Sequence, residues 1–203
     1  MTATQPDLFG TDVSVLPAGM RFQEDFIDPA EEAALLAAIA GLALHEARYK
    51  SYTARRRIRS YGTRYDYDDN RLLPAEPLAP FLLPLREKVA AWAGVAPEDF
   101  GNALVAEYRP GTPLGWHRDV PDYELVGGVS LGGHARMRLR PYPPESGSKA
   151  DVRVLELPPR SAYVLQGVAR WGWQHSILPT TELRWSITFR TRRERGSRGT
   201  QLE

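Results

Sequence analysis

The chain has 203 residues, with 26 Lys and Arg against 25 Asp and Glu, 42% hydrophobic residues and no cysteine. The net charge of +1 excludes a uniformly basic, histone-like protein. The absence of cysteine excludes disulfides, cysteine nucleophiles, thiolate zinc sites and iron–sulfur clusters. Any bound metal must therefore use histidine and carboxylate ligands, and the length suits one globular domain.

The N-terminal segment predicts an arm followed by a helix. Residues 1–19 are polar with little periodicity, and we expect a flexible arm there. Asp28 suits the N-cap and Pro29 the first turn of a helix over residues 30–39, whose apolar residues have helical spacing. The longest apolar stretch, residues 33–44, is shorter than the roughly 20 residues that span a bilayer. With no signal-peptide core at the start, we expect a cytoplasmic protein without a membrane segment.

Basic and aromatic residues are interleaved over residues 48–69, where the tyrosines favour extended strands. A proline-rich stretch follows, and then a short helix over residues 81–93. We expect residues 20–99 to supply the N-terminal helices and a substrate lid, with arginines for phosphates and aromatic rings for stacking. The candidate substrate residues are Arg57, Arg59, Tyr61, Arg64, Tyr65 and Trp116. The alternative is a solvated basic strand whose tyrosines pack on the core.

The pattern from residue 100 onwards is that of short β-strands, with no helix between them. We expect strands at residues 102–108, 125–131, 136–140, 152–157, 161–165 and 184–190. Such spacing argues for an antiparallel sandwich or barrel, and the helices before it make the class α+β. Glycine pairs at 127–128 and 132–133 predict turns or bulges. We assign residues 100–191 to this core and 192–203 to a basic polar tail, within one structural domain that we expect to be a monomer.

One pair of side chains points to a metal site. His117 and Asp119 lie two residues apart, so in extended backbone both face the same side. A third ligand must come from elsewhere, and His175 is the leading candidate, with His134 a weaker one. Two histidines and one carboxylate are typical of non-haem Fe(II) oxygenases. The alternative is a solvated loop histidine.

The last predicted strand has one polar and one apolar face. Arg184, Ser186, Thr188 and Arg190 alternate with apolar residues. Inside a sandwich this polar face would be costly unless an anion binds there, and arginine binds carboxylates in a bidentate manner. A dicarboxylate co-substrate would supply that partner. The alternative is an exposed edge strand with solvated arginines.

Taken in order, these motifs resemble the AlkB family of Fe(II)/2-oxoglutarate dioxygenases over roughly residues 100–190. The motifs are Tyr108-x-Pro110-Gly111, His117-x-Asp119, His175 and Arg184-x-Ser186-x-x-x-Arg190. Residues 56–67 look like the lid strands of that family. The LPPRS sequence at 157–161 and Gly167-x-x-Arg170 are similar to the subgroup containing the oxygenase domains of tRNA wobble-uridine hydroxylases.

The resemblance implies a double-stranded β-helix (jelly-roll) core, a nucleotide-recognition lid, and Fe(II), 2-oxoglutarate and O2. It implies that His117, Asp119 and His175 bind iron, with Arg190 nearby in the catalytic centre. It also implies that Tyr108, Arg184, Ser186 and Arg190 bind 2-oxoglutarate. Repair members of the family often carry Asn where this chain has Ala106 and Ser186, and only Ser186 keeps a side-chain donor, so the departures bear on co-substrate affinity.

The implied activity is oxidative demethylation or hydroxylation of alkylated or modified bases in DNA or RNA, as in repair of alkylation damage. One alternative is an AlkB-like oxygenase that acts on a protein or a small molecule. Another is a non-catalytic nucleic-acid-binding module. The sequence leaves the choice between DNA, RNA and protein open.

Overall fold

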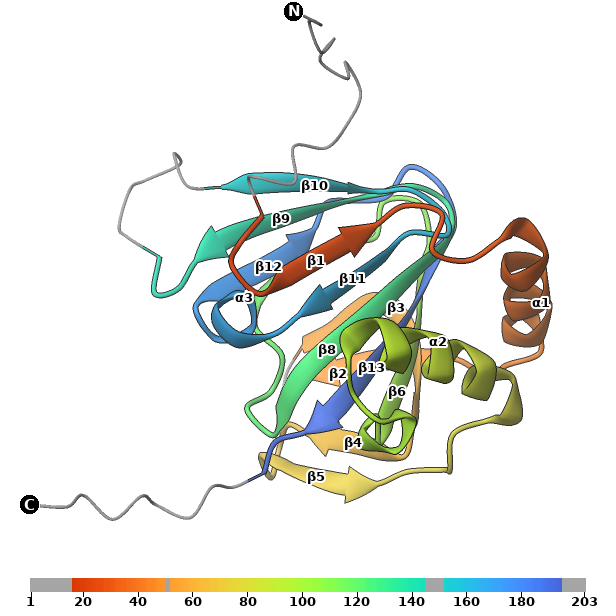
Figure 1. The fold of residues 1–203 in the computed structure, drawn as a ribbon, viewed down its shortest axis with the longest axis horizontal. Helices are drawn as coiled ribbons and strands as arrows, with labels where there is room; N and C mark the ends of the chain where they lie inside the picture. The colour runs from red at the N-terminus through yellow and green to blue at the C-terminus, as the bar shows by residue number, and fades with distance from the viewer. Residues whose placement is uncertain (1–15, 50–51, 145–151, 195–203) are drawn as a thin grey trace, which may run out of the picture.

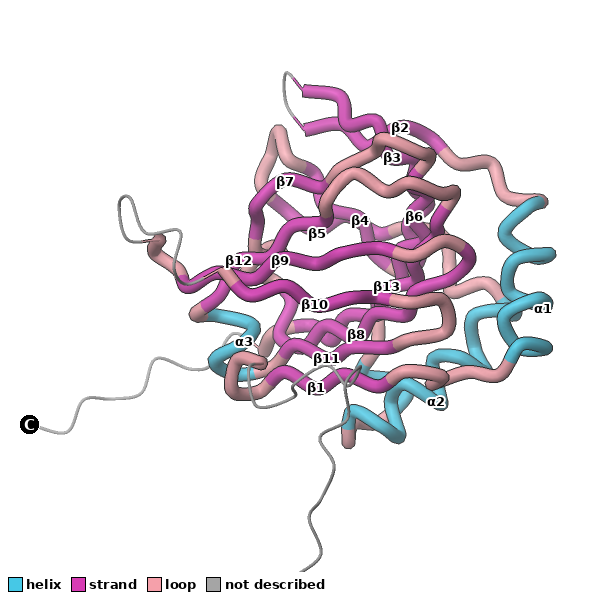
Figure 2. Tube along the Cα trace, turned by 90° about the horizontal axis from the view of Figure 1, so that it is seen from above, coloured by secondary structure: helices cyan, strands magenta, loops and turns pink. Residues whose placement is uncertain are grey.

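The computed structural model describes residues 16–49, 52–144 and 152–194. Two antiparallel sheets face each other, and two helices cover the outer face of the larger sheet (Figures 1 and 2). This arrangement is a jelly roll, and it confirms the expected α+β class with a β core. Within these ranges no helix has the length and apolar character needed to cross a bilayer.

The larger sheet contains β1 (Met20–Gln23), β2 (His45–Tyr49), β3 (Tyr52–Tyr61), β6 (Asn102–Tyr108), β8 (Tyr123–Gly132), β11 (Ala162–Leu165) and β13 (Arg184–Arg192). The smaller sheet contains β7 (Leu114–His117), β9 (Ala135–Pro141), β10 (Arg153–Leu157) and β12 (Trp173–Ile177). A separate hairpin pairs β4 (Thr63–Asp66) with β5 (Arg71–Pro74). The helices are α1 (Pro29–Ala40), α2 (Leu83–Ala93) and α3 (Gly167–Trp171), with 3₁₀ turns at Pro80–Leu82 and Pro97–Asp99.

The strand order is β1-β11-β8-β13-β6-β3-β2 in the larger sheet and β10-β9-β12-β7 in the smaller one. All six strands predicted after residue 100 are present, with ends shifted by at most two residues. Strands β1, β2, β7 and β12 and helix α3 were not expected. These elements have only four or five residues each.

The start of helix α1 follows the capping chemistry predicted for it. The Asp28 carboxylate accepts from the Glu31 backbone N–H at 2.8 Å, and the Glu31 carboxylate accepts from the Asp28 N–H at 2.8 Å. This reciprocal capping box satisfies two backbone donors that a helix leaves open. Glu31 also accepts from Lys88 Nζ at 2.8 Å, which links α1 to α2.

The structure describes only the inner ends of the predicted N-terminal arm and C-terminal tail. Residues 1–15 and 195–203 lie outside the described ranges. Residues 16–19 are attached to the core, because Leu16 packs on it and the Gly19 carbonyl accepts from Gln166. At the other end, the Arg193 N–H donates to the Asp122 carbonyl at 2.8 Å.

Strand β8 separates two hydrophobic cores, and the glycine pair at 127–128 sits in its middle rather than at a turn. A Cβ at Gly127 would lie 2.6 Å from Val89 of α2. A Cβ at Gly128, on the opposite face, would collide with the Tyr163 ring. The prediction of a turn or bulge here was wrong, because these glycines serve close packing on both faces. Gly132, with φ of +75°, does end the strand as expected.

Candidate metal centre and adjoining cavities

The smaller sheet brings the three predicted metal ligands together. His117 on β7 and His175 on β12 are directly opposite each other across an antiparallel pair. Asp119 follows β7 by two residues, and the candidate ligand atoms of all three residues lie within 4.8 Å of one another. His134 lies elsewhere, at the β8–β9 turn and 3.6 Å from Glu156. The weaker alternative for the third ligand is therefore not in the cluster.

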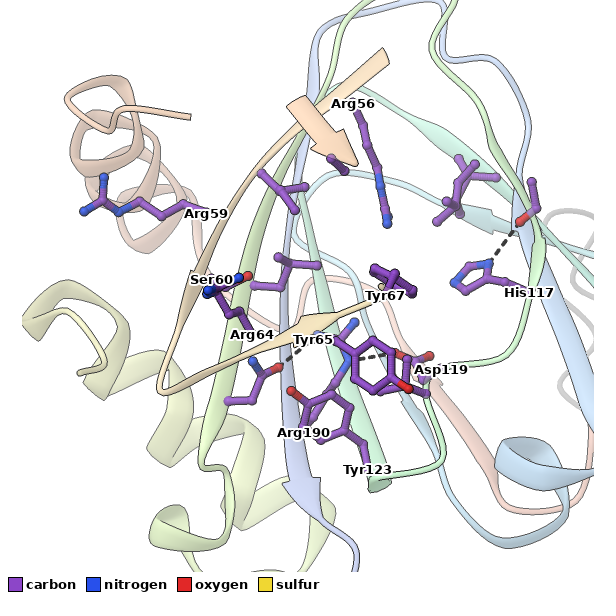
Figure 3. A pocket seen from close by; sticks show the side chains of 18 of the residues that line it. Arg56, Arg59, Ser60, Arg64, Tyr65, Tyr67, His117, Asp119, Tyr123 and Arg190 are labelled. Atoms are coloured by element: carbon purple, nitrogen blue, oxygen red, sulfur yellow. Dashed lines mark hydrogen bonds and ion pairs between the residues drawn. The ribbon is translucent and has the colours of Figure 1, made fainter. Parts of the chain in front are cut away.

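Neighbouring groups orient the ligands. His117 Nδ1 lies 2.9 Å from the Gly115 carbonyl, which only accepts, so the bond places the proton on Nδ1 and leaves Nε2 for a metal. Arg190 Nε donates to Asp119 Oδ1 at 2.6 Å, and Arg190 Nη1 donates to Asn102 Oδ1 at 3.1 Å. Figure 3 shows Arg190 beside Asp119 at the base of a cavity.

The electrostatics favour the metal-binding protonation states. Burial alone would raise the pKa of the Asp119 carboxyl, but Arg190 and the imidazoles of His175 and His117 hold it well below its usual range. Burial and the adjacent His117 lower the pKa of His175 to about 3. Burial likewise lowers the pKa of His117. At neutral pH the cluster is therefore one carboxylate and two neutral imidazoles, which is the donor set a divalent metal requires.

Arg170 fixes the loop that carries Asp119. This buried side chain, on α3, donates from Nη2 to the carbonyls of Asp119, Val120 and Tyr123 at 2.8–3.1 Å. Three backbone acceptors on one guanidinium leave the loop little freedom. The sequence motif that contains Arg170 indicates only a resemblance to a subgroup of the family, and the role of Arg170 in holding this loop follows from the fold.

A second, smaller cavity lies between the two sheets beside the candidate metal ligands, and Arg184, Tyr108 and Ser186 line it. Arg184 is only 2% exposed, its Nε donates to Ser130 Oγ at 3.1 Å, and its guanidinium lies 4.9 Å from the Tyr108 ring centroid. Within the described ranges no carboxylate lies within ion-pair distance of it. β13 is central in the sheet, which excludes the edge-strand alternative. A buried guanidinium without an anion is costly, so the small cavity that Arg184 lines between the sheets has the charge to attract a carboxylate.

The two departures from the family pattern lie next to each other in this cavity. Ser186 is directly opposite Ala106 in the β13–β6 pair, and both line the cavity. Burial would raise the pKa of the Tyr108 phenol, but the Arg56 and Arg184 guanidiniums hold it below its usual value. The Tyr108 hydroxyl is therefore a hydrogen-bonding group placed between two guanidiniums in this cavity.

A larger cavity of about 1310 Å³ opens onto the metal ligands. His117 and Asp119 form part of its wall (Figure 3). On the lid side are Tyr65 of β4 and Tyr67 just after it, whose ring centroids are 4.9 Å apart. The charged residues that line it are Arg56, Arg59, Arg64, Arg118, Arg138 and Arg190 against Glu46, Glu76 and Asp119. The excess of arginine makes the cavity electropositive although the whole chain is nearly neutral.

The structure brings only part of the predicted substrate set to this cavity. Arg59, Arg64, Tyr65 and Trp116 line it. Arg57 does not, because it makes a bidentate ion pair with Glu107 at 2.7 and 2.9 Å on the other face of the sheet.

Tyr61 and Arg59 share that outward side of β3. Tyr61 is buried in the core between helices and sheet, and Arg59 pairs with Glu76 at the rim, directed away from His117 (Figure 3). Successive side chains alternate along a strand, so Arg56, Ile58 and Ser60 face the cavity instead. Of the three candidate substrate residues on β3, Arg59 reaches the rim of the cavity, whereas Arg57 and Tyr61 do not line it. The missed residues Arg56 and Tyr67 were part of the same basic–aromatic segment.

The fold and site together define a class of protein. A jelly roll that holds two histidines and one carboxylate on one side, next to a buried arginine pocket, is the arrangement of mononuclear non-haem iron oxygenases.

Comparison with known proteins gives the family. Residues 19–194 match the family described as "2OG-Fe(II) oxygenase superfamily", and the chain belongs to it. It is therefore a dioxygenase that uses Fe(II), 2-oxoglutarate and O2. Bound iron with these co-substrates supplies the oxidation of an unactivated C–H bond, and the protein supplies binding and orientation.

Two curated relatives confirm the expected AlkB-like resemblance. The chain is 29% identical over 180 residues to an Arabidopsis thaliana protein named "Alkylated DNA repair protein ALKBH8 homolog", covering 78% of this chain and 50% of that protein. It is 29% identical over 172 residues to a Xenopus tropicalis "tRNA (carboxymethyluridine(34)-5-O)-methyltransferase alkbh8", covering 81% and 26% respectively. The chain thus spans half or less of the length of these relatives.

Solved structures support the fold. "The structure of OsALKBH1" superimposes with a TM-score of 0.61 at 13% identity, covering 85% of this chain and 98% of that one. A Pseudomonas putida prolyl-4-hydroxylase gives 0.58 at 17% identity, covering 87% and 93%. These similarities confirm the jelly roll.

Proposed function

We propose that the protein oxidises an alkylated or modified base in DNA or RNA, removing an N-methyl group or hydroxylating a carbon-linked group. The observation that carries this proposal is the arginine-rich cavity of about 1310 Å³ that opens directly onto His117 and Asp119. Arginines suit the phosphates of a nucleotide, and the Tyr65 and Tyr67 rings suit a base. The printed names of the two curated relatives, which mention alkylated DNA and tRNA, support the same class of substrate.

In this proposal each residue has a distinct task. His117, Asp119 and His175 hold the metal, and Arg190 keeps the Asp119 carboxylate ionised and oriented. Arg184 binds the distal carboxylate of 2-oxoglutarate. Tyr108 and Ser186 donate hydrogen bonds in the same pocket. The chain's own groups thus orient both the co-substrate and the substrate, while the metal with its co-substrates supplies the oxidation.

The test is oxidation of defined oligonucleotides. We would incubate the protein with Fe(II), 2-oxoglutarate and single-stranded DNA or RNA carrying an N-methylated base, or RNA carrying a 5-substituted uridine, and analyse the products by mass spectrometry. Loss of the methyl group with release of formaldehyde, or gain of one oxygen atom, is the expected result. His117→Ala is the matched inactive control.

Turnover of 2-oxoglutarate without oxidation of any oligonucleotide would contradict the proposal. Oxidation of a protein or a small metabolite under the same conditions would then replace it. A protein that binds oligonucleotides but releases no succinate with any of them would instead be a binding module.

A further inference from the structure

The outer face of the smaller sheet carries a cluster of side chains to which the roles proposed above assign no individual task. Met137 and Leu139 of β9 point into the core between the sheets, so the alternating residues Arg136, Arg138 and Arg140 point outward. Arg138 and Arg140 extend across β12 to the indole of Trp116 on β7. We call Trp116, Arg138 and Arg140 the arginine–tryptophan face.

Each arginine of this face is held in a fixed orientation. Arg138 Nε donates to Ser176 Oγ at 3.0 Å, and Arg140 Nε donates to Gln174 Oε1 at 2.8 Å. Their guanidinium carbons lie 4.7 and 4.4 Å from the centroid of the Trp116 ring. Each guanidinium stacks on the indole and has one nitrogen held by a hydrogen bond. These two contacts remove most of the conformational freedom that a surface arginine usually has.

The remaining nitrogens of both arginines are available to a ligand. Within the described ranges, neither Arg138 nor Arg140 has a carboxylate within 4.0 Å, and only their Nε atoms donate hydrogen bonds. Arg136, on the same strand and the same face, is different because its Nε pairs with Glu156 at 3.0 Å. The face therefore presents two oriented, uncompensated forks that suit phosphate oxygens.

The face continues into the larger cavity. Trp116 and Arg138 line both, and Arg118, which follows the metal ligand His117, stacks on Tyr142 at 3.7 Å from the ring centroid. Because two guanidiniums already lie against Trp116, its ring serves here as a platform for arginines rather than for a base.

We propose that the arginine–tryptophan face binds the phosphodiester backbone of a single-stranded nucleic acid, next to the nucleotide whose base enters the cavity. Arg138 and Arg140 are two residues apart on a strand, roughly 6.7 Å, which is comparable to one nucleotide step of an extended strand. Each contacts one of two successive phosphates. This inference rests on the proposed function for its ligand, and it adds the path that the strand takes out of the site.

The test is the salt dependence of binding. We would measure the affinity of the full chain for a fluorescein-labelled single-stranded oligonucleotide of mixed sequence, made as RNA and as DNA, over a series of KCl concentrations. Each phosphate contact contributes about 0.7 to the slope of log K against log salt for single strands. R138A/R140A should therefore lower the slope by about 1.4 and weaken binding by at least about tenfold. R136A, whose charge is already paired, is the matched control and should leave both unchanged.

R138Q/R140Q keeps long polar side chains and replaces the alanine variant if that variant does not fold. A double variant with the slope of the original protein overturns the inference, and so does a protein that binds neither oligonucleotide. If a modified base is oxidised while the slope is unchanged, the inference fails and the proposed function stands. If the slope falls but no base is oxidised, the face binds nucleic acid and the proposed reaction is wrong.

Discussion

Replacing Arg184 by methionine tests the pocket next to the metal ligands. The guanidinium is 2% exposed and, among the described residues, has no carboxylate partner, so its charge is available to a bound anion. Removing one partner of a buried charge pair costs roughly 3 kcal/mol or more. We therefore expect the dissociation constant of 2-oxoglutarate to rise by at least about 100-fold in R184M.

The assay is an anaerobic titration of the iron-loaded protein with 2-oxoglutarate, followed by its visible charge-transfer absorbance. R184K is the matched control, because lysine keeps the charge but not the bidentate geometry of arginine. Its affinity for 2-oxoglutarate should fall less than that of R184M. Without co-substrate, R184M should unfold at a temperature no lower than the original protein, since an unpaired buried charge has been replaced by an apolar chain of similar size. An unchanged affinity for 2-oxoglutarate in R184M would refute the reasoning.

Two further substitutions test the support of the site. Asn102 accepts from Arg190 and donates to the Thr63 carbonyl at 2.7 Å, so N102A should weaken Fe(II) binding by about tenfold, measured by metal titration. An unchanged affinity for iron in N102A would show that Arg190 keeps its position without the Asn102 side chain. A Cβ at Gly128 would collide with Tyr163, so G128A should lower the free energy of unfolding by about 1–3 kcal/mol in thermal or chemical denaturation. G101A, which adds its Cβ in open space, is the control, and equal effects of the two substitutions would contradict the packing argument.

The polar face of β13 shows what a strand pattern can predict. Alternation of Arg184, Ser186 and Arg190 with large apolar residues predicted one apolar and one polar side. In the structure the apolar side packs in the core beneath the helices, and the polar side lines the small cavity between the sheets. The spacing of His117 and Asp119 was equally informative, because two residues apart on extended backbone means one side of a sheet.

The orientation of β3 was not predictable in the same way. Both of its faces carry arginines, so polarity does not identify the inner side, which depends on pairing with β6. Glu107 on β6 pairs with Arg57 on the outward side, whereas Ile58, opposite Ala106, faces the cavity. Likewise, β12 is a strand because it pairs with β9 and β7 on its two sides, contacts that no local pattern contains.

The most direct measurement of the central claim is spectroscopic. Fe(II) and 2-oxoglutarate would be added to the metal-free protein under anaerobic conditions, with His175→Ala and His134→Ala examined beside it. The account predicts a visible charge-transfer band in the original protein and in H134A, and its loss in H175A, because His175 lies in the ligand cluster and His134 does not. Absence of the band from the folded original protein, or its persistence in H175A, would contradict the assignment of the metal centre.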